Sequence, residues 1–269
     1  MKLKIAILGA GNLAWNLAPA LEDAGHEITE VYARELHKAK EITERIYSAS
    51  PKDDLDFSES IAQLFILAIK DDAIADVADQ VILPEGSILV HTSGAISLEV
   101  LSQSSASYTG VFYPLQSFTK GKKVDFEEVP FLLESEDEET LQLLKKLAKS
   151  LSTLVYTLRH KDRQAVHVAA VFASNFTNHM LRIAEDILHR QGLDPELLKP
   201  LIIESISKSL QLGAKKAQTG PAIREDYETL EAHHHFLGYN EQLAELYRLI
   251  SQDIIDSWLL LGEFFIEFQ

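Results

Sequence analysis

The stretch KIAILGAGNLAWNLAPALEDAGH, residues 4–26, decides the fold of the first half of the chain. An apolar run typical of a buried strand leads into Gly9-x-Gly11-x-x-Ala14, and an amphipathic stretch typical of a helix follows. Glycine at the first position permits a tight turn, glycine at the second lets a pyrophosphate approach the backbone, and a small third residue lets the helix pack on the strand. The phosphates would rest on the helix N-terminus, where free N–H groups favour an anion. We therefore predict a dinucleotide site; the alternative is a glycine-bearing turn in a non-binding α/β domain.

Short apolar runs and amphipathic stretches alternate from this point to about residue 155, which predicts βαβ units. Strands are expected at KIAILGA, EITEVYA, LFILAIK, SILVHTS, YTGVFYP, VPFLLES and TLVYTL, and helices at about 12–24, 35–47, 71–81 and 137–150. After residues 159–163 only helical patterns remain, at about 161–191, 195–217, 226–236 and 240–267. The predicted fold class is α/β: an NAD(P)-binding, doubly wound Rossmann domain over 1–157 and an all-helical substrate and dimerisation domain over 158–269.

Composition excludes several classes of function. A net charge of −16 opposes binding to nucleic acid or to an anionic membrane, because both need clustered Lys and Arg. The absence of cysteine excludes disulfides, thiolate metal sites and a cysteine nucleophile, and it fits a cytoplasmic protein. The late apolar stretch SWLLLGEFFIEF, residues 257–268, is short for a membrane span and carries two glutamates, so we expect an interface helix.

The end of the second predicted strand bears on the choice of cofactor. Arg34 stands about 20 residues beyond the glycines, where an acid would hydrogen-bond the ribose of NAD. This predicts NADP, while the adjacent Glu35 keeps NAD as the alternative. Two further strands end in polar residues that would line the cofactor crevice or serve as caps and turns. The predicted cofactor-binding residues are Gly9, Gly11, Asn12, Leu13, Arg34, Ile69, Lys70, Thr92, Ser93 and Gly94.

Several motifs carry a family resemblance. GAGNLA, LAIKDDAI and HTSGA resemble the 6-phosphogluconate-dehydrogenase-like NADP oxidoreductases, which include pyrroline-carboxylate reductase and the deazaflavin-dependent NADP reductases. GVFYPLQSF (110–118), HVAAVFASNFTNHM (167–180) and TGPAIRED (219–226) resemble, more narrowly, uncharacterised Rossmann-like oxidoreductases with a helical C-terminal domain. The resemblance implies NADP as cofactor and a substrate held between the first C-terminal helix and the nicotinamide.

The helix expected over AVHVAAVFASNFTNHML is apolar around most of its circumference, so we expect it to be buried. At about 100° per residue, His167, Ser174 and Asn178 fall within roughly 40° of one another, with Asn175 further round. We predict these four as catalytic residues, His167 moving a proton and Asn175 binding a carbonyl or imine. Hydrogen bonding between helices is the alternative. The lysine that β-hydroxyacid dehydrogenases carry on this helix is missing, which weakens alcohol oxidation as the reaction.

Other candidates lie in the family-like loops. Tyr113 and Gln116 are predicted to bind substrate, and Arg224 to clamp a substrate carboxylate. The three histidines at 233–235 are consecutive on a predicted helix and point in different directions, so no metal site is expected.

The last helix is expected to pair two copies of the chain. Its apolar residues recur at near-heptad spacing, from Leu243 to Phe265, with a surplus around Leu261 that predicts a homodimer through the helical domain. The sequence as a whole predicts an NADP-dependent oxidoreductase that transfers a hydride to or from a small carbonyl or imine compound in a site between the domains. The alternatives are a non-catalytic NADP-binding sensor and a pyrroline-carboxylate-type imine reductase.

Overall fold

The computed structural model describes residues 2–266, with side chains described through Ser257. Its internal contacts divide the chain into two compact units, Met1–Leu181 and Arg182–Gln269, which are described separately below. The division falls within a helix, whereas the predicted boundary near residue 157 was placed where the strand pattern stops.

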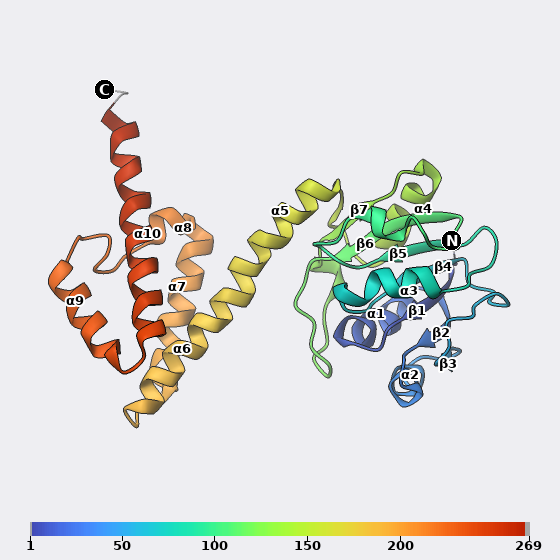
Figure 1. Ribbon diagram of the computed structural model, residues 1–269, viewed down its shortest axis with the longest axis horizontal. Coiled ribbons are helices and arrows are strands. Elements are labelled where there is room, and N and C mark those ends of the chain that lie inside the picture. The colour runs from blue at the N-terminus through green and yellow to red at the C-terminus, as the bar shows by residue number, and fades with distance from the viewer. Residues whose placement is uncertain (1, 267–269) are drawn as a thin grey trace. The chain divides into compact units, whose positions relative to one another are not determined.

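The first unit is built on one eight-stranded sheet with the order β3-β2-β1-β4-β5-β6-β7-β8 (Figure 1). Its strands are β1 (Lys4–Leu8), β2 (Glu27–Tyr32), β3 (Ser50–Lys52), β4 (Leu64–Leu67), β5 (Ile88–His91), β6 (Tyr108–Pro114), β7 (Phe131–Glu134) and β8 (Val155–Thr157). All neighbours are parallel except β6 and β7, which are antiparallel. The predicted doubly wound α/β fold is confirmed. Strand β3 was not predicted, because its sequence, SPK, carries no apolar pattern.

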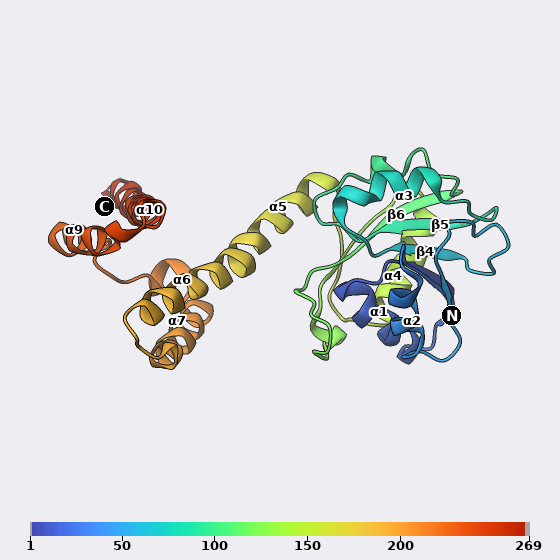
Figure 2. The same cartoon turned by 60° about the horizontal axis from the view of Figure 1, so that its bottom comes forward.

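Both faces of this sheet are covered, which explains the near-continuous apolar runs of its strands. The helices of this unit that pack on it are α1 (Asn12–Asp23), α2 (Leu36–Thr43), α3 (Ile74–Gln80) and α4 (Glu138–Lys149). Figure 2 shows α3 on one side of the sheet and α1, α2 and α4 on the other. Successive strand residues alternate between two buried clusters: Ile5 and Ile7 belong to the α1 side, Ala6 and Leu8 to the α3 side.

A single continuous helix leaves the sheet after β8, in three parts. It comprises α5 (His160–Ala170), a π-helical segment (Val171–Phe176) and α6 (Thr177–Arg190). The predicted 3.6-residue period does not hold through this helix, because π-helical bonds run from residue i to i+5 and shift the faces. The prediction that the helix is buried is also wrong within the described chain: Val168, Phe172 and Phe176 are 50%, 64% and 47% exposed. These three apolar side chains are therefore exposed to solvent among the residues that the structure describes.

The second unit is helical, as predicted. It contains the end of α6, then α7 (Lys199–Leu212), α8 (Ala214–Ala217), α9 (Tyr227–Phe236) and α10 (Glu241–Ile266). The helix predicted over 195–217 is broken at Gly213, whose φ of 84° favours glycine. Of the helices that the structure describes, none combines the length and the apolarity needed to span a membrane.

Two tyrosines of this unit, Tyr239 and Tyr247, contact basic side chains from neighbouring helices. Arg190 lies over the ring of Tyr239 at 4.0 Å. His233 Nδ1 lies 2.8 Å from the hydroxyl of Tyr247, and among the described side chains, residues 2–257, no three metal-ligating groups converge. The side chains of Trp258, Leu261 and Phe265, on which the predicted dimer helix partly relied, lie outside those that the structure describes.

Candidate active site

The glycine turn between β1 and α1 has two positions with different requirements. Gly9 has a φ of 134°, and a Cβ added there would lie 2.1 Å from the carbonyl oxygen of Ala68. Only glycine therefore fits this close approach between the ends of β1 and β4. Gly11 meets nothing within 4 Å of such a Cβ, and as the N-cap of α1 it leaves the helix without a side-chain cap. The backbone at Gly11 is open, and the first N–H groups of α1 are free to receive an anion.

This turn lies at the point where the strand order reverses, because β2 lies on one side of β1 and β4 on the other. In open α/β sheets ligands bind outside the carboxyl ends of the strands at such a point. Ile69 and Lys70 follow β4, and Thr92, Ser93 and Gly94 follow β5, at the same edge. Five predicted cofactor-binding residues beyond the glycine turn are thus brought to one edge of the sheet.

Two of these side chains are already used by the protein. The Thr92 hydroxyl donates to the carbonyl oxygen of Leu67 at 2.9 Å, which ties the ends of β5 and β4 together. The buried Ser93 hydroxyl accepts from the backbone N–H groups of Ala95 and Ile96, both at 3.1 Å. These hydroxyls shape the loop, so their contribution to a ligand site is the backbone geometry that they maintain.

The residues after β2 present an exposed positive charge. Arg34 is exposed and makes no ion pair or side-chain hydrogen bond among the residues that the structure describes. Glu35 next to it accepts from Lys38, and its other oxygen lies 3.8 Å from His37 Nε2. The hydrogen bond from Lys38 lowers the pKa of the Glu35 carboxyl. The negative charge of Glu35, which disfavours a phosphate at this position, is therefore paired with the positive charge of Lys38.

Gly94, Tyr113 and His167 meet at the edge of the sheet where β5 and β6 end. The hydroxyl of Tyr113 lies 3.1 Å from His167 Nδ1, and the two rings pack edge to face with centroids 6.0 Å apart. A Cβ at Gly94 would lie 2.6 Å from His167 Nδ1 and 2.7 Å from the Tyr113 ring. From the sequence, Gly94, Tyr113 and His167 were predicted separately, as a cofactor-binding, a substrate-binding and a catalytic residue. The structure brings them into direct contact.

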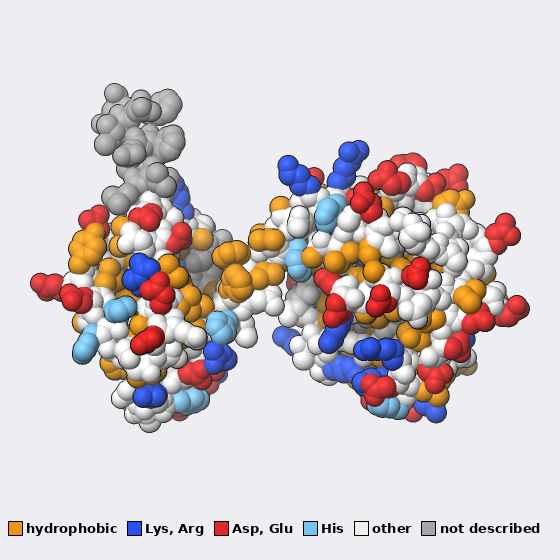
Figure 3. Space-filling model, viewed as in Figure 1, with side chains coloured by type: hydrophobic (Ala, Val, Ile, Leu, Met, Phe, Trp, Pro, Cys, Tyr) orange, Lys and Arg blue, Asp and Glu red, His pale blue; other side chains and the backbone are white. Residues whose placement is uncertain are grey.

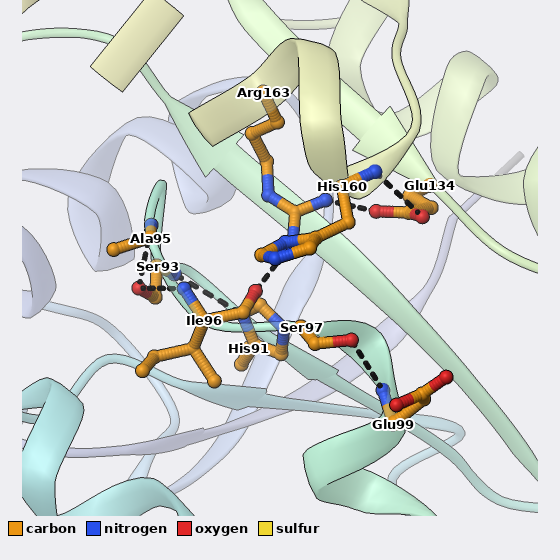
Figure 4. Close-up of polar contacts among 9 residues, drawn as sticks. All are labelled: His91, Ser93, Ala95, Ile96, Ser97, Glu99, Glu134, His160 and Arg163. Atoms are coloured by element: carbon orange, nitrogen blue, oxygen red, sulfur yellow. Dashed lines mark hydrogen bonds and ion pairs between the residues drawn. The ribbon is translucent and has the colours of Figure 1, made fainter. Parts of the chain in front are cut away.

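A buried arginine fastens α5 to the sheet one helical turn before His167 (Figure 4). Arg163 is fully buried; one terminal nitrogen donates to a carboxylate oxygen of Glu134, at the end of β7, and the other to the carbonyl oxygen of Ile96. The other carboxylate oxygen of Glu134 accepts from the backbone N–H of His160 at 3.0 Å, so the same side chain caps α5. We call Glu134 and Arg163 the latch; because residues 163 and 167 share a helix face, it sets the position of His167.

His91 lies beneath this latch and is neutral. Its Nδ1 accepts from the backbone N–H of Ser93 at 3.2 Å, and its buried Nε2 has no hydrogen-bond partner within the described part of the chain. Burial, followed by the charge of Arg163, lowers the pKa of His91 to about 3. Protonating His91 would place a second positive charge beside the buried guanidinium.

The comparisons with known proteins assign the chain to a family. A Rossmann-like domain model matches residues 1–111, and the model of a domain of unknown function, DUF2520, matches residues 129–254. The crystal structure of a candidate NADP oxidoreductase from Bacteroides fragilis is 37% identical, with a TM-score of 0.86, covering 95% of this chain and 98% of that one. The chain belongs to this family of Rossmann-like proteins with a DUF2520 domain. No curated protein matches it.

More distant structures share the fold of the DUF2520 family. A protein from Thermotoga maritima is 24% identical, with a TM-score of 0.70, covering 92% of this chain and 99% of that one. The 1-pyrroline-5-carboxylate reductase of Streptococcus pyogenes is 16% identical, with a TM-score of 0.57, covering 95% and 99%. The resemblance that the sequence motifs carry is confirmed at the level of family and fold.

The remaining predicted residues of the first unit make no contact with Tyr113 or His167 through a hydrogen bond of their side chains. Ser174 and Asn175 lie exposed in the π-helical segment and Asn178 lies exposed at the start of α6, and no hydrogen bond of their side chains is found among the described residues. Gln116 is exposed in the loop after β6, where its side-chain oxygen accepts from the N–H of Ser117 at 2.8 Å. Arg224 lies in the second unit, in the loop before α9.

Sequence reasoning missed both residues of the latch. Glu134 ends an apolar strand run, and Arg163 stands in the charged segment RHKDR, which resembles an ordinary solvated helix start. A weak signal existed: an arginine one turn before an apolar helix face, four residues before the candidate His167, lies on the same face as that histidine.

Proposed function

We propose that this member of the DUF2520 family is an NADP-dependent oxidoreductase that transfers a hydride between NADP(H) and a small carbonyl or imine compound. The observation that carries the proposal is the glycine turn. A Cβ at Gly9 would lie only 2.1 Å from the Ala68 carbonyl oxygen, so the turn excludes any side chain there, and Gly11 stays open beside an uncapped helix. This is the geometry that a pyrophosphate needs. The description of the Bacteroides fragilis relative as a candidate NADP oxidoreductase supports it.

The cofactor is assigned to residues at the carboxyl edge of the sheet. The turn and the first residues of α1, Asn12 and Leu13, would hold the pyrophosphate, while Ile69, Lys70 and the loop from Thr92 to Gly94 would line the nicotinamide half. The bound nicotinamide supplies or accepts the hydride. The protein binds and orients the two reactants and moves the accompanying proton.

NADP is favoured over NAD because Arg34 is exposed and free among the described residues, while Glu35 is paired with Lys38. A guanidinium at the end of β2 suits a 2′-phosphate on the adenine ribose. The opposite arrangement, an acid free to accept from two ribose hydroxyls, would suit NAD.

The substrate is assigned to the neighbourhood of Tyr113 and His167, which are in contact at the same edge of the sheet. Ser174, Asn175, Asn178, Gln116 and Arg224 remain candidates for binding its polar groups. The chain from about residue 158 onward, which begins with α5, is assigned to substrate binding and dimerisation.

A second copy of the chain is the partner that the exposed apolar side chains call for. On the helix that leaves the first unit's sheet these are Val168, Phe172 and Phe176. In the second unit they include Leu197, Leu201, Ile203, Ile206 and Leu210, which are between 47% and 82% exposed. Large apolar side chains clustered along helices mark interfaces rather than ordinary surface (Figure 3). The proposed assembly is a homodimer through the helical region.

Calorimetric titration of the protein with NADPH and NADH at one stated ionic strength tests the cofactor assignment. We expect NADPH to bind at least about tenfold more tightly, a difference of about 1.4 kcal/mol. Arg34→Ala should remove that preference, whereas Lys40→Ala, which deletes another exposed charge from α2, should keep it. Equal affinities in the wild type would contradict the NADP assignment, and binding without turnover of any carbonyl or imine would indicate a sensor.

A further inference from the structure

Tyr113 and His167 form a closely packed pair whose contact depends on the absence of a side chain at residue 94. The phenol oxygen lies 3.1 Å from His167 Nδ1, and Gly94 leaves both rings the space that a Cβ would occupy. Tyr113 is the next-to-last residue of β6, which runs parallel to β5, so it lies at the carboxyl edge of the sheet where the cofactor is assigned. A close pair of ionisable rings at this edge has the form of a proton-transfer site.

The surroundings of Tyr113 keep its phenol protonated at neutral pH. Burial, followed by the negative charge of Asp71 after β4, raises the pKa of Tyr113. Two other hydroxyl groups of this edge are committed elsewhere, since Thr92 donates to Leu67 and Ser93 caps its own loop, while Lys70 at the same edge is exposed. Tyr113 is therefore the group at this edge that carries a proton and has His167 as its neighbour.

We propose that Tyr113 is the acid that protonates the substrate oxygen during reduction, that His167 resupplies its proton, and that the substrate is consequently a carbonyl compound rather than an imine. This inference rests on the proposed function, because it needs a reduced nicotinamide cofactor as the hydride donor.

The chemistry balances as follows. The carbonyl carbon gains the hydride and the carbonyl oxygen gains the proton of the Tyr113 hydroxyl, so the C=O bond becomes H–C–O–H. The phenolate left behind takes the proton of His167 Nδ1, while a proton from water enters the ring at Nε2. His167 is only partly buried, so water can reach the ring. The reaction consumes one solvent proton and one reduced nicotinamide. The phenol is restored, and the His167 ring, left as its Nε2–H tautomer, returns to the Nδ1–H tautomer by gaining a proton at Nδ1 and losing one at Nε2 in exchange with water.

An imine does not need this pair. An alkyl imine is protonated on nitrogen near neutral pH, so hydride addition yields a neutral amine with no further proton. A carbonyl oxygen would instead develop a full negative charge, and a positioned acid contributes about 10²–10⁴-fold in rate. A phenol kept neutral beside a histidine therefore favours the carbonyl among the substrate classes that the proposed function allows.

The proposal requires one direction for the hydrogen bond between the two residues. His167 Nδ1–H must donate to the phenol oxygen, so that the phenol hydrogen stays free for the substrate. In a free histidine side chain the proton favours Nε2 instead, so the required Nδ1–H tautomer is a distinctive state. It can be detected without cofactor or substrate.

Nitrogen NMR of histidine-labelled protein, slightly alkaline so that the rings are neutral, tests this requirement. The His167 signal is assigned by its loss in His167→Gln. We expect His167 as the Nδ1–H tautomer in the wild type and in Tyr108→Phe, a control on the same strand, and a shift toward Nε2–H in Tyr113→Phe. A wild-type His167 with a bare Nδ1 would overturn the proposal, because the phenol hydrogen would then be bound to the ring.

Turnover of a panel of aldehydes, ketones and cyclic imines with NADPH provides the second test. We expect Tyr113→Phe to lower kcat on a carbonyl substrate by about 100-fold or more, with unchanged NADPH affinity, and Tyr108→Phe to leave it unaltered. Added imidazole should partly restore the activity of His167→Ala, which a purely structural role would not permit. Turnover of imines alone, indifferent to Tyr113→Phe, would overturn this inference but leave the proposed function standing. A wild type that binds no NADPH would overturn both.

Discussion

Polar candidate residues occur in two regions, the carboxyl edge of the sheet and the helix that runs from α5 into α6. The two regions differ in whether those residues have hydrogen-bond partners. At the sheet edge, Thr92, Ser93 and Tyr113 each have a partner within the chain. Along the helix, His167 is held by Tyr113, whereas Ser174 and Asn175 are exposed and bound to nothing that the structure describes.

The difference shows that a helix face acquires a defined chemical position where it is fastened to the sheet, not where its polar residues cluster. The latch ends at Arg163, and His167 follows one turn later on the same face. Beyond His167 the π-helical segment changes which residues share a face of the helix, and the apolar side chains of this segment are exposed. The sheet edge and α5 as far as His167 therefore hold the candidate chemistry, and the exposed apolar side chains beyond it are those of the proposed dimer interface.

The largest expected effect separates the two glycines of the turn. Gly9→Ala should lower the free energy of unfolding by about 4 kcal/mol, since it combines backbone strain with a clash against the Ala68 carbonyl. Gly11→Ala meets nothing within 4 Å and should leave stability nearly unchanged while weakening NADPH binding. Urea unfolding and calorimetric titration measure the two effects. Equal stability losses in the two variants would contradict the division of roles.

The architecture could be predicted from sequence further than the site could. The apolar runs predicted the strands with the exception of β3, and the glycine motif with its flanking pattern predicted the doubly wound order. The antiparallel direction of β7 could not be predicted from the sequence, because the apolar run FLLE is equally compatible with a parallel and an antiparallel strand. The π-helical segment was equally invisible, since i to i+5 bonds impose no pattern on residue types.

The site was predicted as single residues, not as contacts. Gly94, Tyr113 and His167 were all named, but nothing in the sequence joins residues that are 54 positions apart, as Tyr113 and His167 are. The latch was missed for the opposite reason. Charged residues at a helix start are usually solvated, so burial of Arg163 depends on tertiary packing that a local pattern does not contain.

The second prediction removes the ion pair of the latch, Glu134 and Arg163, which holds the start of α5 against the sheet. Glu134→Gln should lower the free energy of unfolding by about 3 kcal/mol, because it leaves the buried guanidinium of Arg163 without a counter-charge. Arg163→Met combined with Glu134→Gln should recover part of that loss, since the pair is then replaced by neutral groups. Denaturant unfolding of the singles and the double forms the cycle. Additive losses would show that the two residues do not act together.

The third prediction uses acid to weaken the same region. Because the native pKa of His91 is about 3 and its unfolded value about 6.5, the native state binds no extra proton as the pH falls through this window while the unfolded state does. The stability associated with neutral His91 is full above pH 6.5 and declines below it, by about 2 kcal/mol at pH 5. His26, whose pKa burial also lowers, adds to the same trend.

His91→Asn isolates the share of His91, because the amide can still accept from the Ser93 N–H and does not titrate. Unfolding free energies of wild type and variant, measured from pH 7.5 to 5, should diverge in slope rather than only in level. Parallel slopes would mean that His91 is not the buried neutral group that the structure describes.

The fourth prediction concerns a substitution on the exposed part of the helix. It should change the free energy of unfolding least of all and affect the proposed dimer most. Phe172 and Phe176 pack edge to face with ring centroids 4.9 Å apart, and both stand at the surface. Phe172→Asp should change the free energy of unfolding of the single chain by no more than about 0.5 kcal/mol, as for other surface substitutions. It should nevertheless dissociate the proposed homodimer, because a carboxylate buried without a partner in an apolar interface is strongly unfavourable.

Tyr47→Asp is the control. Its side chain is 96% exposed elsewhere on the first unit, so this substitution should leave the dimer intact. Multi-angle light scattering at micromolar concentration distinguishes these outcomes, and a monomeric wild type would show that this helix faces something other than a second copy.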